Sequence, residues 1–263
     1  RPTLLFLHGT ASSIRGSFGA LWEPEKVDLR KKLFEPYGTN VLALEHATLS
    51  TSPVQNAIDL LEALPADARL HLVSHSRGGL VGELLCRKMA AGAREPFTAD
   101  ELEAFSLLNP DGKRGDLAEL NRLLKKKTFM VERFVRVACP AWGTTLASRR
   151  FDIYLSILFN LLSKIPFLSG VPGVNIVHDV FSELVMLVAK ERTDPSVLPG
   201  IEAMIPGSPL VQLLNRPDCT VEGELRVIAG DMEGGTLLSA LGTLATDPVF
   251  RKDNDLVVDT EAM

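Results

Sequence analysis

Short apolar runs alternate with amphipathic helical patterns along this chain, and the alternation constrains the fold more than any other feature. Five apolar runs are predicted to be buried strands: Leu4–Leu7, Val41–Leu44, Leu70–Val73, Phe134–Cys139 and Leu225–Ala229. Helical patterns separate them, over residues 53–65, 77–91 and 98–127. Strands that alternate with helices favour an α/β fold, with a mainly parallel sheet and helices on both faces.

Local sequence signals define the ends of the first helical pattern and divide the third pattern in two. Ser52 is a favourable N-cap, Pro53 suits the first helical position, and Gln55 is placed to close a capping box. Pro65 ends the same helix. The pattern over residues 98–127 is split by the turn signal Asn109–Gly112, so it predicts two helices rather than one.

Length and composition indicate one large domain. The chain has 263 residues, of which 46% are hydrophobic and 23% charged, and this excludes a disordered chain, a collagen and a coiled rod. We expect a single domain over residues 1–263, with a helical lid insertion over residues 148–215. Within that insertion Ile153–Leu168 is mostly apolar, with Lys164 as its only charged residue, and Val180–Ala189 is similar.

Charge and cysteine content narrow the classes of partner. The net charge of −5 comes without a basic stripe, so nucleic acid is not an expected partner. The three cysteines, Cys86, Cys139 and Cys219, are too scattered for a disulfide framework, which favours a reduced, cytoplasmic setting. No zinc-ligand spacing and no phosphate-binding glycine loop occur, so we expect neither a metal nor another cofactor.

One serine lies where a buried strand runs directly into a helix. In the segment Leu70–Leu80, Ser76 is flanked two residues away by Ser74 and Gly78, close to the nucleophile-elbow pattern G-x-S-x-G. Small residues are needed there because the strand and helix backbones crowd. Such a turn exposes the Ser76 hydroxyl and aims the first N–H groups of the helix at the same point. The alternative is an ordinary strand–turn–helix connection with small residues by chance.

Three further segments carry a resemblance to known proteins. Cys139–Ala147 resembles the T-P-x-x-G-T-x-L-A segment, and Pro206–Asn215 the P-x-S-P-x-x-x-x-L-N segment, of the lipase and esterase branch of the α/β-hydrolase superfamily. Asn254–Val257 resembles the N-D-G-L-V segment of the same proteins. Phe6–Ser13 also resembles hydrolase-like domains of large bacterial multidomain proteins, some of which carry a CHAT module.

The resemblance implies an α/β-hydrolase fold and a serine esterase or lipase-like hydrolase. Ser76 would be the nucleophile and Asp255 the triad acid, with Asp231 as the alternative acid and Asp253 as a second one.

After the first strand, His8, Gly9 and Thr10 occupy the place of the second oxyanion donor, although an ordinary tight turn explains them equally well. The backbone N–H groups of Thr10 and Arg77 would form the oxyanion hole, flanked by His75 and Gly78.

The sequence departs from the family pattern most seriously at the histidine. The usual chain order is serine, acid, histidine, but none of the five histidines follows Asp255. His178, in the insertion, would have to fold over the site against that order. Because the chain starts at Arg1 and has no Met start, we expect a domain excised from a longer protein, with further domains of that chain as partners and the histidine beyond Met263. The alternative is a catalytically inactive module for sensing or interaction.

The insertion bears on the substrate. Its apolar residues favour a lipidic or otherwise hydrophobic ester and a peripheral contact with lipid through the lid. A helical pair buried for packing alone is the competing interpretation. Two smaller departures, Ser74 and Leu256 in place of glycine, are tolerable changes of side chain.

Overall fold

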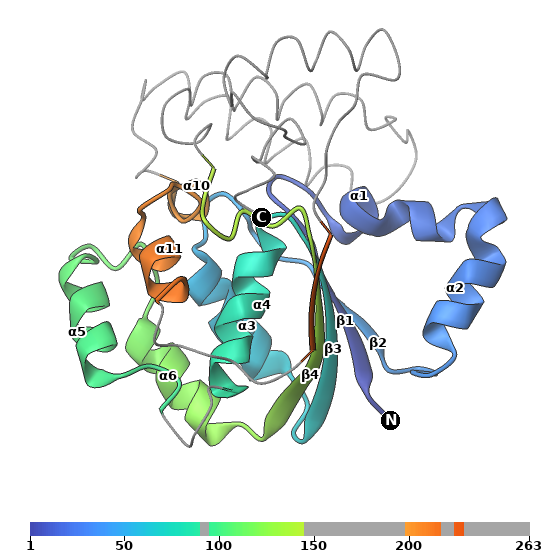
Figure 1. The fold of residues 1–263 in the computed structure, drawn as a ribbon, viewed down its shortest axis with the longest axis horizontal. Helices are drawn as coiled ribbons and strands as arrows, with labels where there is room; N and C mark the ends of the chain where they lie inside the picture. Colours follow the sequence, from blue (N-terminus) through green and yellow to red (C-terminus); the bar gives the residue numbers. More distant parts are fainter. Residues whose placement is uncertain (90–94, 145–197, 217–223, 229–263) are drawn as a thin grey trace, which may run out of the picture.

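A five-stranded parallel sheet forms the centre of the molecule (Figure 1). The computed structural model describes residues 1–89, 95–144, 198–216 and 224–228. The strands lie in the order β2-β1-β3-β4-β5, and every neighbouring pair is parallel. Their bounds are β1 Thr3–Leu7, β2 Val41–Leu44, β3 Ala68–His75, β4 Phe129–Val137 and β5 Glu224–Ile228. The predicted α/β class with a parallel sheet is confirmed.

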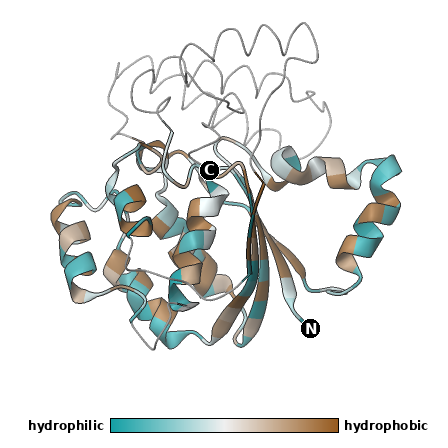
Figure 2. Ribbon diagram, viewed as in Figure 1, coloured by the Kyte–Doolittle hydropathy of each residue, from teal (hydrophilic) through white to brown (hydrophobic). Residues whose placement is uncertain are grey.

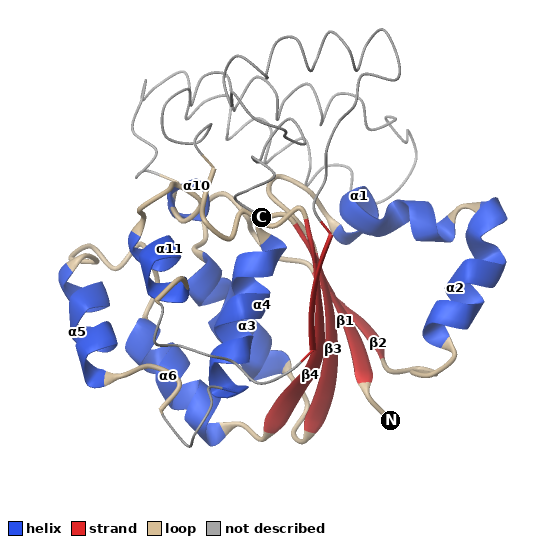
Figure 3. Ribbon diagram, viewed as in Figure 1, coloured by secondary structure: helices blue, strands red, loops and turns tan. Residues whose placement is uncertain are grey.

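Helices cover both faces of this sheet (Figures 1 and 3). One side carries α3 Pro53–Ala63, α4 Gly78–Cys86, α5 Ala99–Leu107 and α6 Leu117–Lys126, with a 3₁₀ turn, η3 Arg87–Met89, after α4. The other carries α1 Ile14–Phe18 and α2 Val27–Phe34, joined by the 3₁₀ turns η1 Gly19–Trp22 and η2 Pro24–Lys26. Two short helices, α10 Pro199–Glu202 and α11 Pro209–Leu214, come from the described end of the insertion. None of the described helices is long and apolar enough to cross a membrane.

The alternation of side chains along β1 divides the core into two layers. Leu5 and Leu7 point into the main cluster between the sheet and helices α3, α4 and α6. Phe6 points to the opposite face, where its ring lies 4.9 Å from that of Phe18 and 6.2 Å from that of Phe34. Figure 2 shows hydrophobic residues, in brown, along the strands of the sheet. Each fully buried leucine stabilises the fold by about 1.5–3 kcal/mol, so the main cluster dominates.

The start of α3 corrects one prediction in part. Ser52 is the N-cap, and its side chain accepts from the Gln55 N–H at 3.1 Å, as expected. The Gln55 side chain, however, donates to Asp59 at 2.8 Å, so the capping box does not close. Asp59 lies one turn further along the same face and competes for the amide. A complete capping box occurs instead at α5, between Thr98 and Glu101.

Several element boundaries differ from the sequence expectation, among them those of β3, which extends two residues beyond the predicted run at each end. β4 begins at Phe129, five residues before the predicted start, because Glu132 is held on the sheet by Arg69 and His71 of β3. Because the charged Glu132 interrupts the apolar run, the sequence pattern did not include this part of the strand. Within the described residues, the predicted helix over residues 77–91 consists of α4 followed by η3, and residues 90 and 91 lie outside them. The buried Arg87 side chain at the start of η3 donates to Glu101 and to Pro96 O.

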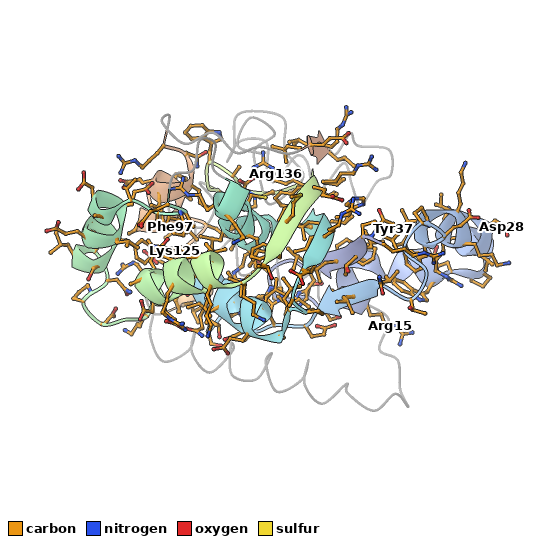
Figure 4. The ribbon with its side chains drawn as sticks, turned by 90° about the horizontal axis from the view of Figure 1, so that it is seen from below. Arg15, Asp28, Tyr37, Phe97, Lys125 and Arg136 are labelled. Atoms are coloured by element: carbon orange, nitrogen blue, oxygen red, sulfur yellow. The ribbon has the colours of Figure 1, made fainter. Side chains whose placement is uncertain are left out.

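Polar side chains organise the two faces differently (Figure 4). Phe97 lies among the helices on one side, beneath the Arg87 guanidinium at 4.8 Å from the ring centroid. Tyr37 lies on the other side, where its hydroxyl is 2.8 Å from His71 Nδ1. Arg136 of β4 pairs with Glu83 of α4. Arg87 and Glu101, which are both buried, also form an ion pair, and this pairing offsets the cost of their desolvation.

Candidate active site

Ser76 lies at the corner between β3 and α4. β3 ends at His75 and α4 begins at Gly78, and Ser76 has φ of +50°. Its N–H donates to Val137 O at 2.8 Å, and its carbonyl accepts from the Gly79 N–H at 2.9 Å. A serine in this left-handed region costs about 1–3 kcal/mol, and such strain persists only where the surroundings impose it. The corner geometry expected from the sequence is present.

Two glycines allow this corner to form. A Cβ on Gly78 would lie 2.5 Å from Leu7 O and 2.7 Å from His8 O, so the start of α4 presses against the end of β1. A Cβ on Gly9 would lie 2.9 Å from the Cβ of Ser76. Any other residue at either position would push the turn after β1 away from the serine. The glycines therefore bring the His8–Thr10 turn and the elbow together.

Ser74 takes the place of the usual first glycine without disturbing the corner. Its side chain is fully buried, and its hydroxyl has no hydrogen-bond partner within the described residues. Gly79 lies beside it, and an added Cβ there would lie 2.2 Å from the sulfur of Cys139 but at an ordinary contact distance of 3.4 Å from Ser74 Oγ. The missing side chain at Gly79 therefore makes room for Cys139.

The turn after β1 presents the Thr10 N–H. The His8 ring accepts from the His46 N–H through Nε2 at 3.2 Å, so Nδ1 carries the proton and donates to Gly9 O at 3.0 Å. The Gly9 carbonyl and the Thr10 N–H belong to one rigid peptide plane and point in opposite directions. The His8 bond therefore fixes the direction of the Thr10 N–H. No acceptor for this N–H lies among the described residues.

The described histidines are engaged away from the Ser76 hydroxyl. His75 Nδ1 lies 3.2 Å from Ser17 Oγ, and His71 lies between Tyr37 and Glu132. The rings of His8 and His46 stack with centroids 4.1 Å apart. Within the described part of the chain, no hydrogen bond joins the Ser76 hydroxyl to a histidine. The base of a serine mechanism is not supplied by these rings as they stand.

Burial keeps three of these histidines neutral. Desolvation lowers the pKa of His46 to about 3, with smaller contributions from the nearby His8 and Arg77. Burial likewise lowers the pKa of His8, although Gly9 O and Glu45 oppose the shift. The pKa of His75 is lowered by burial and by His8. The half-buried Ser76 is therefore surrounded by imidazoles that are uncharged near neutral pH.

Several predicted site residues lie outside the described residues. These are His178 and the three candidate acids, Asp231, Asp253 and Asp255, together with residues 145–197 of the insertion. Their roles stay predictions. Cys139 is fully buried, and burial raises the pKa of its thiol to about 12, which leaves no thiolate to act as a nucleophile.

The described end of the insertion packs against the segment that follows β4. Met204 O accepts from the Thr144 N–H at 2.7 Å, and the Asn215 side chain donates to Ala141 O at 2.6 Å. Gly143 has φ of +85°, and a Cβ there would lie 2.6 Å from Pro206 N. The two segments singled out by their resemblance to lipases, residues 139–147 and 206–215, thus contact each other.

One open volume lies away from Ser76. A cavity of about 360 Å³ lies between α10 and the loop that joins α5 to α6, lined by Pro110, Asp111, Lys113, Arg114, Pro199 and Glu202. Arg114 and Glu202 pair within it at 3.1 Å. Among the described residues, no group of three or more histidine, cysteine, aspartate or glutamate side chains could hold a metal ion. The arrangement around Ser76 offers a hydroxyl and backbone donors.

Comparison with known proteins supports the fold. A family model described as a domain of unknown function, DUF7379, matches residues 1–105 and 114–263. No curated protein matches the chain. EstA from Clostridium botulinum is 13% identical, over 99% of this chain and 74% of its own, with a TM-score of 0.56. Lipase 1 from Pelosinus fermentans is 14% identical, over 99% of this chain and 83% of its own, with a TM-score of 0.54.

These likenesses show the α/β-hydrolase fold that the motifs implied. At such low identity they carry the fold alone. The resemblance of Phe6–Ser13 to bacterial multidomain proteins with a CHAT module is not tested by any of these matches and stays a prediction.

Proposed function

The chain belongs to the DUF7379 family and has the α/β-hydrolase fold, and from that premise we propose that it is a serine hydrolase that cleaves a carboxylic ester. Ser76 is the nucleophile. The observation that carries this proposal is the φ of +50° at Ser76, at the end of β3 and directly before α4. The strained serine is supported as a nucleophile because a helix starts directly behind it and because Gly9 brings a second turn close to it.

The chemistry follows from the groups around the corner. Ser76 Oγ attacks the ester carbonyl while a histidine accepts its proton, and the alcohol leaves with that proton. Water then hydrolyses the acyl-serine by the same route. The negative oxygen of each tetrahedral intermediate is bound by the N–H groups of Thr10 and Arg77. Asp255 orients the histidine, and Asp231 is the alternative for this role.

The base lies outside the described residues in this proposal. His8, His46, His71 and His75 are held by other partners. The remaining candidates are His178 and a histidine that follows Met263 in a longer protein, and we favour the second because it keeps the chain order of the fold. Without a base a serine hydroxyl is a weak nucleophile at neutral pH.

The substrate we propose is a hydrophobic ester. The apolar residues of the insertion support it, because they exceed what one packed helix face requires. Comparing p-nitrophenyl acetate with the octanoate tests this point. A strict preference for the acetate would assign those residues to packing instead.

Hydrolysis of p-nitrophenyl esters tests the nucleophile. We expect Ser76→Ala to lower kcat/KM by about 10⁴-fold, the loss that removal of a triad member commonly causes. Ser74→Ala is the matched control, because it removes a hydroxyl two residues away that is buried and unpartnered within the described residues. Equal loss in both variants would count against Ser76 as the nucleophile. His178→Ala, and a chain extended past Met263, separate the two sources of the base.

A non-catalytic hydrolase-like module is the second candidate. It is favoured by one observation: no described histidine reaches the Ser76 hydroxyl. Such a module would bind a ligand at the same corner without turnover. It is accepted if neither the 263-residue chain nor its extension hydrolyses esters and Ser76 resists acylating reagents.

A further inference from the structure

The side chain of Arg77 joins the elbow to two other segments. Arg77 follows Ser76 directly and is completely buried. Its Nε donates to Gly200 O at 3.1 Å, and its Nη2 donates to Thr51 O. Both acceptors are backbone carbonyls on different loops. A buried guanidinium is costly unless it is hydrogen-bonded, so these contacts fix its position and, through the short stem, the backbone that carries it.

Gly200 is seated closely on the loop that Arg77 also holds. Its N–H donates to Leu49 O at 3.0 Å, and a Cβ added to it would lie 2.0 Å from Thr48 O. No side chain fits between these two backbones. The first turn of α10 is therefore pressed against residues 48–51, and Arg77 bonds to both partners. Figure 1 places α10 at the end of the sheet where β1 leads to α1.

The same two segments contact the turn that carries Thr10. The Thr10 hydroxyl donates to the sulfur of Met204 at 3.4 Å, in the residues that follow α10. The neighbouring Ala11 N–H donates to the Thr48 hydroxyl at 2.8 Å. Arg77 thus contacts both segments directly, whereas Thr10 contacts Met204 and its neighbour Ala11 contacts Thr48.

We propose that the Arg77 guanidinium is a positioning group, which holds the oxyanion hole in place by tying it to the segment Leu198–Met204. The inference rests on the proposed function, because it concerns the same serine and the same two N–H donors. Donors of this kind act only within a few tenths of an ångström of the right place, and a misplacement of about 1 Å can cost a hundredfold in rate. In this proposal the segment Leu198–Met204 stays in place and supports the two N–H donors.

The charge of Arg77 adds to this role. After burial, Arg77 is among the causes that lower the pKa of His8 and of His46, so its positive potential reaches the turn beside Ser76. A positive potential there favours the negative oxygen that develops during acyl transfer. Lysine at this position keeps the charge but, as a point donor, holds the two separate carbonyls less well.

Four variants of the 263-residue chain, or of its extended form if that form is needed for turnover, test the coupling. Arg77→Met removes the donors, and Arg77→Lys retains the charge. Gly200→Ala separates α10 from residues 48–51 without touching the elbow. Arg114→Met is the matched control, because Arg114 also binds α10, through Glu202, but belongs to the loop between α5 and α6. Each is assayed for kcat and KM on p-nitrophenyl butyrate and for amide hydrogen exchange.

We expect the four variants to differ in kcat and in amide hydrogen exchange. Arg77→Met and Gly200→Ala lower kcat about 10²-fold with KM within about threefold, the signature of an interaction made in the transition state. Amide exchange over residues 48–52 and 198–205 becomes about 10- to 100-fold faster, while α6 is unchanged. Arg77→Lys recovers part of kcat. Arg114→Met keeps the kcat of the parent chain.

The two readouts separate the possible failures. Unchanged exchange in Arg77→Met would overturn the tie between Arg77 and α10. Faster exchange with an unchanged kcat would overturn the positioning role and leave Ser76 as nucleophile. An equal fall of kcat in Arg114→Met would make the effect one of general loosening and would also overturn it. If neither form hydrolyses the ester and Ser76 resists acylation, the proposed function and the positioning role both fail. Amide hydrogen exchange still tests whether Arg77 holds α10 in place.

Discussion

Two neighbouring strands, β3 and β4, end at the same edge of the sheet with a residue of positive φ: Ser76 at +50° and Ala138 at +49°. Each residue donates its N–H to the next strand, Ser76 to Val137 O at 2.8 Å and Ala138 to Ile228 O at 2.9 Å. The backbones are alike, but the residues that follow differ. Ser76 leads through Gly78 into α4, whereas Ala138 leads through Cys139 into a loop.

The difference separates the conformation from the chemistry. A left-handed residue at the end of a strand turns the chain out of the sheet, and Ala138 does this without any reactive group. The Ser76 corner adds a hydroxyl, a helix start directly behind it and a second turn brought close by Gly9. We infer that strain alone marks a corner, and that only the combination at Ser76 marks a site.

Exchanging the side chains of the two corners should give the largest effect. Ser76→Ala is expected to lower kcat/KM by about 10⁴-fold, and the double variant Ser76→Ala with Ala138→Ser should not recover it. The new hydroxyl would lack both a helix start and a facing turn. Ester hydrolysis measures the outcome, and Ala138→Ser alone, with parent activity, is the control. Recovery in the double variant would break the distinction between the corners.

Filling the space behind the serine should destabilise the fold. Gly78→Ala places a methyl group 2.5 Å from a carbonyl oxygen of β1, and we expect a loss of about 3 kcal/mol in the free energy of unfolding. Urea denaturation measures it. Gly112→Ala is the control: its φ is +70° but nothing lies within 4 Å, so only about 1 kcal/mol should be lost. A smaller loss at Gly78 than at Gly112 would show that the strand and helix are not in close contact.

Acid should weaken the surroundings of Ser76 through His46. Its pKa is about 3 in the folded chain, below the ordinary value near 6.5, so the unfolded chain binds more protons between these values. Its contribution to stability is therefore present above pH 6.5 and is lost as the pH falls toward 3. We expect about 2 kcal/mol less stability from His46 at pH 5 than at pH 7.5. His46→Asn should flatten the pH dependence of urea denaturation by that amount, and an unchanged slope would contradict the burial of the ring.

Relieving the strain should give the smallest effect and the same one at both corners. Glycine adopts positive φ without steric cost, so Ser76→Gly and Ala138→Gly are each expected to raise the free energy of unfolding by about 1 kcal/mol. Thermal or urea denaturation compares them. A gain at Ala138 without a gain at Ser76 would mean that the serine side chain contributes packing which offsets its strain.

Local patterns predicted most of the fold, because the same residues that are buried also carry the periodicity. The apolar runs located all five described strands, and the Ser52–Pro53 pair located the start of α3. β4 was cut short because Glu132 satisfies its charge with Arg69 and His71, partners 61 and more positions away. The short helices over residues 14–34 contain no fully buried residue and carry no clear apolar stripe, so hydrophobic periodicity did not predict them.

At the candidate site, the turn at Ser76 could be predicted from the sequence, whereas the contact between Arg77 and Gly200 could not. The spacing of Ser74, Ser76 and Gly78 is a local signal for a strand that turns into a helix. The contact of Arg77 with Gly200 spans 123 positions and ends on a backbone carbonyl, which leaves no trace in the side chains. The acids and the base remain predictions, since Asp255, Asp231 and His178 lie outside the described residues.

Covalent labelling tests the central claim most directly. A fluorophosphonate reacts with a serine only where a base and an oxyanion hole activate it, so it reports the assembled site and not the exposure of a hydroxyl. The 263-residue chain and its form extended past Met263 would be treated in parallel, and peptides mapped by mass spectrometry. The account predicts one phosphonylated residue, Ser76, in the form that contains the base, and none in Ser76→Ala. A label on another serine, or none in either form while both remain folded, would contradict it.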